Sequence, residues 1–324
     1  MPGDTVTVLL VAVTVSFVFI CGANDGGALL SLAIRHRGAS GVLVLTVLAL
    51  AVAAGPAVFG LAVAQTFTTK LTGGADGQLT FLVGTSVAIG LVLALTWRGI
   101  PTSITLALLG AIAGAAVGLG STPAWGRLGF VLALGAAAPM VGLTLAFLLG
   151  RAIRRLPFTR VARWTSAVQL LAFLGQSLAY AANDGQKMYA VVATTAVAAG
   201  HPVALGADLL PVVVIAGIFA AGATVSLRRV GRGATATLVR MRPGHVISAE
   251  VSASVAVFGT ASLGVPVSMT QATTGGLIGA ALNHGPRSIR WQYTTPLVVA
   301  WAVTLPAGLV GGLVIGLIVQ GVAR

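Results

Sequence analysis

The sequence Pro-Thr-Ser-Ile-Thr at residues 101–105 is followed by glycines at 110 and 114. The sequence Pro-Val-Ser-Met-Thr at 266–270 is followed by glycines at 275 and 279. Both copies therefore share the pattern P-x-S-x-T-x4-G-x3-G. A second pair of segments precedes them in the same order, Gly-Ala-Asn-Asp-Gly at 22–26 and Ala-Ala-Asn-Asp-Gly at 181–185. Matched positions at fixed offsets behind the same Asn-Asp pair indicate an internal repeat.

The composition places this repeat in a membrane. Hydrophobic residues make up 57% of the 324 residues, and charged residues only 8%, whereas roughly 25% are charged in an average soluble domain. So few charges cannot cover a soluble fold, and a disordered chain would be polar. A single cysteine excludes a disulfide framework and a multi-cysteine metal site. The remaining class is an all-α, polytopic membrane protein.

Ten apolar runs approach the length of about 20 residues that a spanning helix needs. They cover residues 5–22, 40–64, 79–97, 103–120, 126–150, 164–182, 202–227, 246–263, 267–283 and 293–320. Some of them could be re-entrant hairpins, so we expect about ten spans or half-spans.

Each copy of the repeat holds five of these runs. Because five is odd, the second copy enters the membrane from the opposite side, and the two copies form inverted-topology repeats with broken helices. This architecture is typical of secondary transporters. We expect the first repeat over 1–150, a cytoplasmic basic linker over 151–163 and the second repeat over 164–324.

The basic residues predict the orientation. This topology leaves Lys70, Arg127, Lys187 and Arg324 on one side. The other side collects 15 of the 19 basic residues: Arg35, Arg37, Arg98, Arg151, Arg154, Arg155, Arg160, Arg163, Arg228, Arg229, Arg232, Arg240, Arg242, Arg287 and Arg290. Cytoplasmic loops carry the positive excess, so we expect a protein of the cytoplasmic membrane with both termini outside. The arginine clusters indicate topology and contact with the lipid bilayer, not nucleic-acid binding.

Three acids are expected within the membrane, where an ionisable residue is a functional candidate. Asp25 and Asp184 each follow an apolar run and stand between an Asn and a Gly, and Glu250 lies within an otherwise uncharged run. An acid, an amide and the carbonyls freed at a glycine form an all-oxygen site that suits a hard cation. We therefore expect cation coupling, with Na⁺ as a candidate at Asp25, Asp184 and Glu250, and with Asn24 and Asn183 beside it.

The Pro-x-Ser-x-Thr segments are typical of helix starts, because proline suits the first turn and Ser or Thr can cap it. A helix that begins in mid-membrane directs free N–H groups and the positive end of its dipole inward. Two such starts from opposite faces would converge into a cradle for an anion, with hydroxyls from Ser103, Thr105, Ser268 and Thr270. Lys187 could offset the charge of an anion or extend to the outer interface.

These motifs resemble the inorganic phosphate transporter (PiT) family over most of the chain. The segments 183–187 and 266–270 are similar to two signatures of that family, and 301–306 resembles a third stretch near its C-terminus. Glu250 matches a glutamate that the family carries before the second of these signatures. The sequence differs from the family at the end of each Pro-x-Ser-x-Thr motif. Leu106 and Gln271 stand there in place of the histidines that the family carries.

The resemblance implies uptake of inorganic phosphate coupled to Na⁺ or H⁺ by a symporter, with no cofactor beyond a bound Na⁺. The departures leave sulfate or another oxyanion open as substrate, and an anion channel is a further alternative. No enzyme motif is present, so we do not expect this protein to be an enzyme. The sequence leaves open whether the protein forms a homodimer. The candidate substrate-binding residues are Asn24, Ser103, Thr105, Asn183, Ser268, Thr270 and Gln271.

Overall fold

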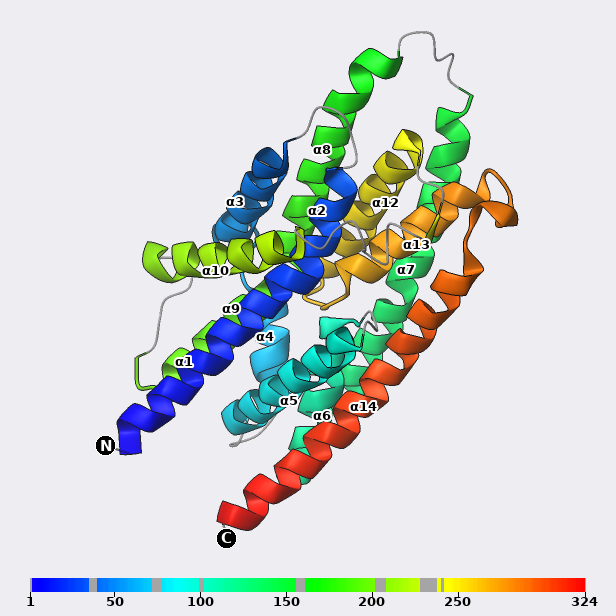
Figure 1. The fold of residues 1–324 in the computed structure, drawn as a ribbon. Coiled ribbons are helices and arrows are strands. Elements are labelled where there is room, and N and C mark those ends of the chain that lie inside the picture. The colour runs from blue at the N-terminus through cyan, green and yellow to red at the C-terminus, as the bar shows by residue number, and fades with distance from the viewer. Residues whose placement is uncertain are drawn as a thin grey trace.

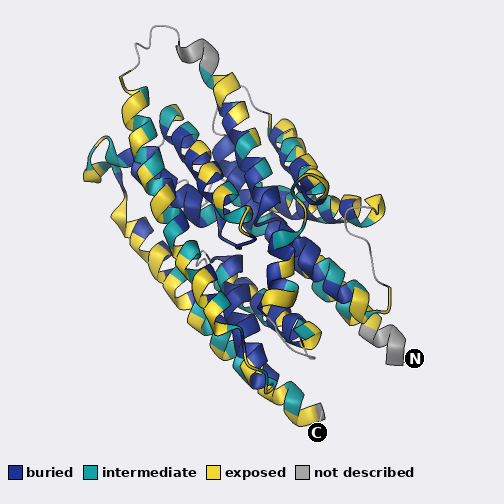
Figure 2. Cartoon of the chain, turned by 180° about the vertical axis from the view of Figure 1, so that it is seen from behind, coloured by how far each residue is buried: buried dark blue, intermediate teal, exposed yellow. Residues whose placement is uncertain are grey.

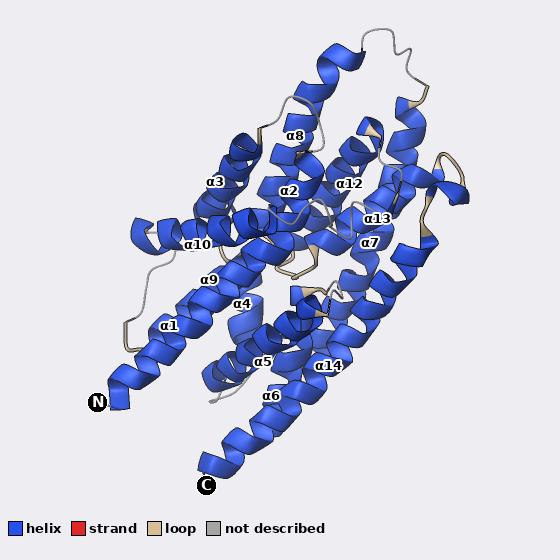
Figure 3. Cartoon of the chain, in the orientation of Figure 1, coloured by secondary structure: helices blue, strands red, loops and turns tan. Residues whose placement is uncertain are grey.

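The computed structural model describes residues 2–34, 40–71, 77–98, 102–155, 161–201, 208–227, 238–239 and 242–323. Within these ranges the chain is helical throughout, apart from loops and a single bridge between Val239 and Ile289 (Figure 3). Six of the described helices are long and apolar enough to cross a membrane. The predicted class, an all-helical polytopic membrane protein, is therefore confirmed.

The described residues of the first half form nine helical segments. They are α1 (Pro2–Cys21), η1 (Gly22–Gly26), α2 (Gly27–Ala33), α3 (Gly41–Phe59), α4 (Ala62–Gln65), η2 (Thr66–Lys70), α5 (Gly77–Trp97), α6 (Ile104–Gly118) and α7 (Trp125–Ile153). The second half contains α8 (Val161–Ala182), α9 (Gln186–Ala198), α10 (Leu209–Leu227), α12 (Pro243–Ala261), α13 (Met269–Leu282), η4 (Pro286–Ser288) and α14 (Trp291–Ala323).

Three of the predicted runs end too early. The first, over 5–22, continues through the π-helical segment η1 and through α2 to Ala33, and the run over 164–182 continues after a short turn as α9. The run over 40–64 breaks at Gly60, whose φ of 68° favours glycine, and α4 and η2 then carry it to Lys70. Polar residues such as Gln186 and Lys187 interrupt the hydropathy, which is why the continuations were not predicted.

The two Asn-Asp segments consequently lie within long broken helices and not at their ends. In the first half α1, η1 and α2 form one such element, and in the second half α8 and α9 form the other. The α1 and α9 helices lie side by side, with the Thr14 and Thr195 hydroxyls 2.8 Å apart. Both breaks therefore reach the interior of the molecule, where buried residues are concentrated (Figure 2).

Two helix pairs have the form of hairpins that meet in the interior. The end of α5 and the start of α6 lie near the middle of the molecule, and from there both helices run toward the end at which the described chain starts and finishes (Figure 1). The α12 and α13 helices also join in the middle, and they open toward the opposite end (Figure 1). The starts of α6 and α13 are thus brought together from opposite directions, as the inverted repeat predicts.

The repeated glycines pack each returning helix against the last helix of the other half. A Cβ atom on Gly110 of α6 would lie 2.2 Å from the carbonyl oxygen of Leu305 on α14. At the matching position Gly275 of α13, a Cβ atom would lie 2.1 Å from the carbonyl oxygen of Pro139 on α7. Only glycine permits backbones to approach this closely, so the two halves are interlocked through α6–α14 and α13–α7.

Candidate functional site

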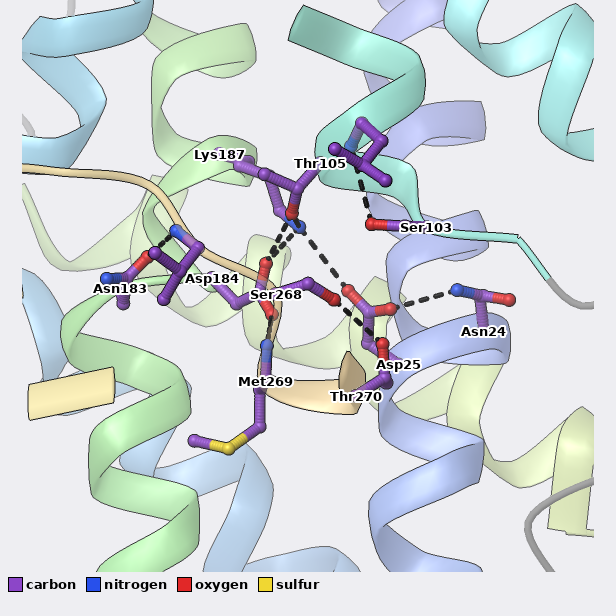
Figure 4. A network of polar contacts seen from close by, with 12 residues as sticks. Asn24, Asp25, Ser103, Thr105, Asn183, Asp184, Lys187, Ser268, Met269 and Thr270 are labelled. Carbon is purple, nitrogen blue, oxygen red and sulfur yellow. Dashed lines mark hydrogen bonds and ion pairs between the residues drawn. The ribbon is translucent and has the colours of Figure 1, made fainter. Parts of the chain in front are cut away.

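Asp184 lies at the centre of a buried polar network at the break between α8 and α9 (Figure 4). Its Oδ2 atom accepts the backbone N–H of Met269, the first residue of α13, at 2.6 Å. Its Oδ1 atom accepts the hydroxyl of Thr105, in the first turn of α6, at 3.0 Å, and also contacts the ammonium of Lys187. One carboxylate therefore joins the starts of both half-helices.

Asp25 comes to the same place from the first half of the chain. It lies in η1, where its Oδ1 atom accepts the side-chain N–H of Asn24 at 2.9 Å. A π-helical turn of this kind is frequent at functional sites. The α10 helix crosses η1 in backbone contact, since a Cβ atom on Gly22 would lie 2.0 Å from the carbonyl oxygen of Phe219. This packing holds Asp25 in the interior.

Lys187 links the two aspartates, and sequence analysis did not include it among the site residues. Its side chain is 1% exposed, so it does not extend to the outer interface. The ammonium forms ion pairs with Asp184 and, at 3.5 Å, with Asp25, and it donates to the Thr105 hydroxyl at 2.9 Å. The signal available in the sequence was the spacing of three residues from Asp184, at which two side chains can come within reach of each other.

Asn183 uses its side-chain amide to fix the loop between α12 and α13. Its oxygen accepts the backbone N–H of Val267 at 3.0 Å, and its nitrogen donates to the carbonyl of Val265 at 2.9 Å. Both contacts lie directly before Ser268. Asn183 thus positions the start of α13 in this structure, whereas Asn24 is half-buried and contacts Asp25.

The predicted capping serines are found at both half-helix starts. Ser103 accepts the backbone N–H of Leu106 at 3.3 Å, and Ser268 accepts that of Gln271 at 3.4 Å. The hydroxyls of Ser268 and Thr270 are 2.9 Å apart. The caps orient the first turns of α6 and α13, whose N–H groups and positive dipole ends suit an oxyanion. Pro101, which precedes the first cap, lies outside the described residues.

Glu250 does not join the two aspartates. It is fully buried in α12, and its Oε2 atom accepts the side-chain N–H of Gln169, on α8, at 2.6 Å. Among the described residues there is no cluster of three acids, histidines or cysteines that could hold a metal ion. Of the three acids that we expect to couple cations, Asp25 and Asp184 therefore share one cluster, and Glu250 lies apart from them with Gln169.

Gln186 is a second polar residue that sequence analysis missed. Its side-chain oxygen accepts the backbone N–H groups of Val63 and Ala64, at 3.0 and 3.1 Å, and its nitrogen donates to the carbonyl of Ala182 at 2.7 Å. Free N–H groups at the start of a helix need acceptors. Gln186 supplies one for α4, so the break in the α3–α4 element is joined directly to the start of α9.

Comparison with known proteins agrees with this arrangement. A sequence profile of the phosphate transporter family matches residues 157–312. A probable low-affinity inorganic phosphate transporter of Mycobacterium tuberculosis is 34% identical over 241 residues, which cover 69% of this chain and 56% of the relative. The chain belongs to the phosphate transporter family.

The chain spans little more than half the length of the mycobacterial relative. Other members of the phosphate transporter family match this chain over more of their length. A Bacillus subtilis protein, also called a probable low-affinity inorganic phosphate transporter, is 23% identical over 310 residues, with 93% of both chains covered. The fold is shared with a solved structure titled the sodium-dependent phosphate transporter. That match has a TM-score of 0.80 at 16% identity and covers 98% of this chain and 100% of the other.

Proposed function

We propose that this protein is a secondary transporter that imports inorganic phosphate together with Na⁺ or H⁺ across the cytoplasmic membrane. The names of its relatives support phosphate as the substrate. The basic loops support an orientation with both termini outside. The division into repeats over 1–150 and 164–324, and a homodimeric assembly, remain predictions.

One observation carries the proposal: a buried carboxylate is bound by the starts of two half-helices that come from opposite directions. Asp184 takes the Met269 N–H and the Thr105 hydroxyl. These donors bind one oxyanion, a carboxylate, and the same types of donor suit the oxygens of phosphate. We place the substrate beside Ser103, Thr105, Ser268 and Thr270, with Asn24, Asn183 and Gln271 at its border.

Cation coupling is needed on energetic grounds. Moving one charge through 100 mV is worth about 2.3 kcal/mol. Divalent phosphate entering an inside-negative cell therefore faces about 4.6 kcal/mol at that potential. Two monovalent cations that enter with it cancel this cost, and a third drives net uptake. We assign cation coupling to Asp25 and Asp184, flanked by Asn24 and Asn183, and separately to Glu250.

The experiment that tests this function is uptake of radiolabelled phosphate and sulfate into proteoliposomes, with Na⁺ and pH gradients varied separately. We expect phosphate to accumulate against its electrochemical gradient when one of the cation gradients is imposed. Preferred uptake of sulfate would identify another oxyanion permease. Equilibration without accumulation under every gradient would identify an anion channel and contradict the proposal.

A further inference from the structure

Three buried charges meet where the two broken helices approach each other (Figure 4). Asp25 comes from η1, Asp184 from the turn between α8 and α9, and Lys187 from the first turn of α9. All three side chains are at most 3% exposed. A lysine is almost never fully buried unless it is paired, and here it is paired with the aspartates of both halves.

The ammonium of Lys187 lies where oxygen ligands converge. Its Nζ atom contacts Asp184 Oδ1, lies 3.5 Å from Asp25 Oδ2 and lies 2.9 Å from Thr105 Oγ1. Two carboxylates and a hydroxyl are the hard oxygen ligands that a small hard cation takes. The three hydrogens of the ammonium match the three oxygens in number.

We propose that Lys187 is a tethered cation, which fills the cation position between Asp25 and Asp184 so that no Na⁺ is needed there. This inference rests on the proposed cation-coupled transport, whose coupling site it makes specific. The ammonium neutralises charge that a transported ion would otherwise have to neutralise in every cycle. Unlike a transported ion, it stays with the protein.

Charge balance gives the consequence. The two carboxylates and one ammonium leave a single net negative charge in this cluster, so one monovalent cation is enough to neutralise it. A neutral side chain at position 187 would leave two negative charges in the interior, which is costly without a counter-ion. Such a variant must recruit one cation more than the wild type does.

The repeat supports this assignment by its asymmetry. Lys187 stands three residues after Asp184, and the residue three after Asp25 is Ala28. One lysine therefore serves the aspartates of both halves. The two repeats therefore differ in charge at the equivalent positions 28 and 187.

The first test compares the thermal stability of purified wild type, Lys187→Met and Lys187→Gln in NaCl and in choline chloride. Methionine approximates the length of the lysine chain, and glutamine keeps a polar end. Lys70→Met is the matched control, because the other lysine of the chain is exposed in η2. We expect the Na⁺-dependent rise of Tm to be larger by a few degrees in both Lys187 variants than in wild type and Lys70→Met.

The gained response should depend on the aspartates. Adding Asp25→Asn to Lys187→Gln removes one negative charge, so the extra Na⁺ response should disappear. A Na⁺ response equal in Lys187→Met, Lys187→Gln and wild type would overturn the proposal. Loss of both variants during purification in both salts would also overturn it, because Na⁺ could then not replace the ammonium.

The second test measures phosphate uptake driven by a pH gradient in Na⁺-free proteoliposomes. We expect wild type to take up phosphate, and Lys187→Gln to fall at least tenfold and to recover when Na⁺ is added. A variant that Na⁺ does not rescue would contradict the tethered cation. Absence of phosphate uptake by wild type under every gradient would contradict the proposed function instead, and the Tm comparison would still decide the role of Lys187.

Discussion

Met269 donates its backbone N–H to Asp184 Oδ2 at 2.6 Å, across 85 residues of sequence. The same carboxylate accepts the Thr105 hydroxyl, 79 residues away in the other direction. Asp184 therefore holds the starts of α6 and α13 in one position relative to each other. A change at this carboxylate affects both charge and geometry.

The substitution Asp184→Asn should abolish uphill phosphate uptake. The amide keeps the size of the carboxylate, but it loses the charge that pairs with Lys187 and one of its two acceptor oxygens. Leaving a buried donor unpaired costs about 1–3 kcal/mol, so the protein should still insert with a lower Tm. The measurement is cation-driven uptake in proteoliposomes, with Asp208→Asn, an exposed aspartate before α10, as control. Wild-type uptake by Asp184→Asn would remove Asp184 from the coupling site.

Removal of the capping hydroxyls should weaken substrate binding. We expect Ser103→Ala and Ser268→Ala each to lose about 1–3 kcal/mol of phosphate affinity if a charge-assisted hydrogen bond is lost. Each should also lose about 1 kcal/mol of stability through the missing cap. Ser40→Ala is the matched control, because Ser40 caps α3 at an exposed position, accepting the Leu43 N–H at 3.1 Å. If the two site variants bound phosphate like the Ser40 control, the half-helix cradle would be wrong.

Substitution of the packed glycines should reduce stability through the α6–α14 and α13–α7 contacts. Gly110→Ala and Gly275→Ala place a Cβ atom against a backbone carbonyl, and overpacking of this kind costs typically about 1–3 kcal/mol. In contrast, Gly90→Ala in α5 meets nothing within 4 Å, so it should be neutral or slightly stabilising. Thermal unfolding in detergent compares the three variants. Equal Tm values for the three variants would show that the α6–α14 and α13–α7 contacts accommodate the added methyl group without loss of stability.

Neutralising Glu250 should separate coupling from substrate binding. Glu250→Gln can keep a hydrogen bond with Gln169, so the fold should persist. We expect cation-driven uptake to fall at least tenfold, while exchange of labelled for unlabelled phosphate without a gradient continues. Gln169→Met keeps the acid and removes its partner, and should retain driven uptake. Equal loss of exchange and driven uptake in Glu250→Gln would place Glu250 at the substrate instead.

The internal repeat singles out the residues of the candidate site in the sequence, because the Asn-Asp and Pro-x-Ser-x-Thr segments each occur twice. The sequence assigns Asp184 to a cation and Thr105 to an anion, and only the structure shows that Asp184 contacts Thr105 and the start of α13 directly. Helix starts and caps are local features, and the residues that form them are neighbours in the chain. The spacing of the glycines is also local, but the helices against which they pack are distant in sequence.

Long-range partners could not be predicted in this way. Gln169 is 81 residues from Glu250, and nothing near either residue indicates the pairing. For Lys187 the sequence left two roles open, beside an anion or at the outer interface, because a hydropathy reading ends a span at a lysine. Its burial depends on Asp25, which the other half of the chain supplies. The burial of Lys187 therefore could not be predicted before its counter-charges were known.

The interlocking of α6 with α14 has a consequence for biosynthesis. The ribosome makes α6 long before α14, the last described helix of the chain, so the glycine face of α6 has no final partner during most of synthesis. The α13 helix, in contrast, finds α7 already in place. The two halves therefore cannot assemble one after the other, and the contact between α6 and α14 forms only after α14 has entered the bilayer. Early release or truncation of the nascent chain would leave that glycine face open to quality-control proteases.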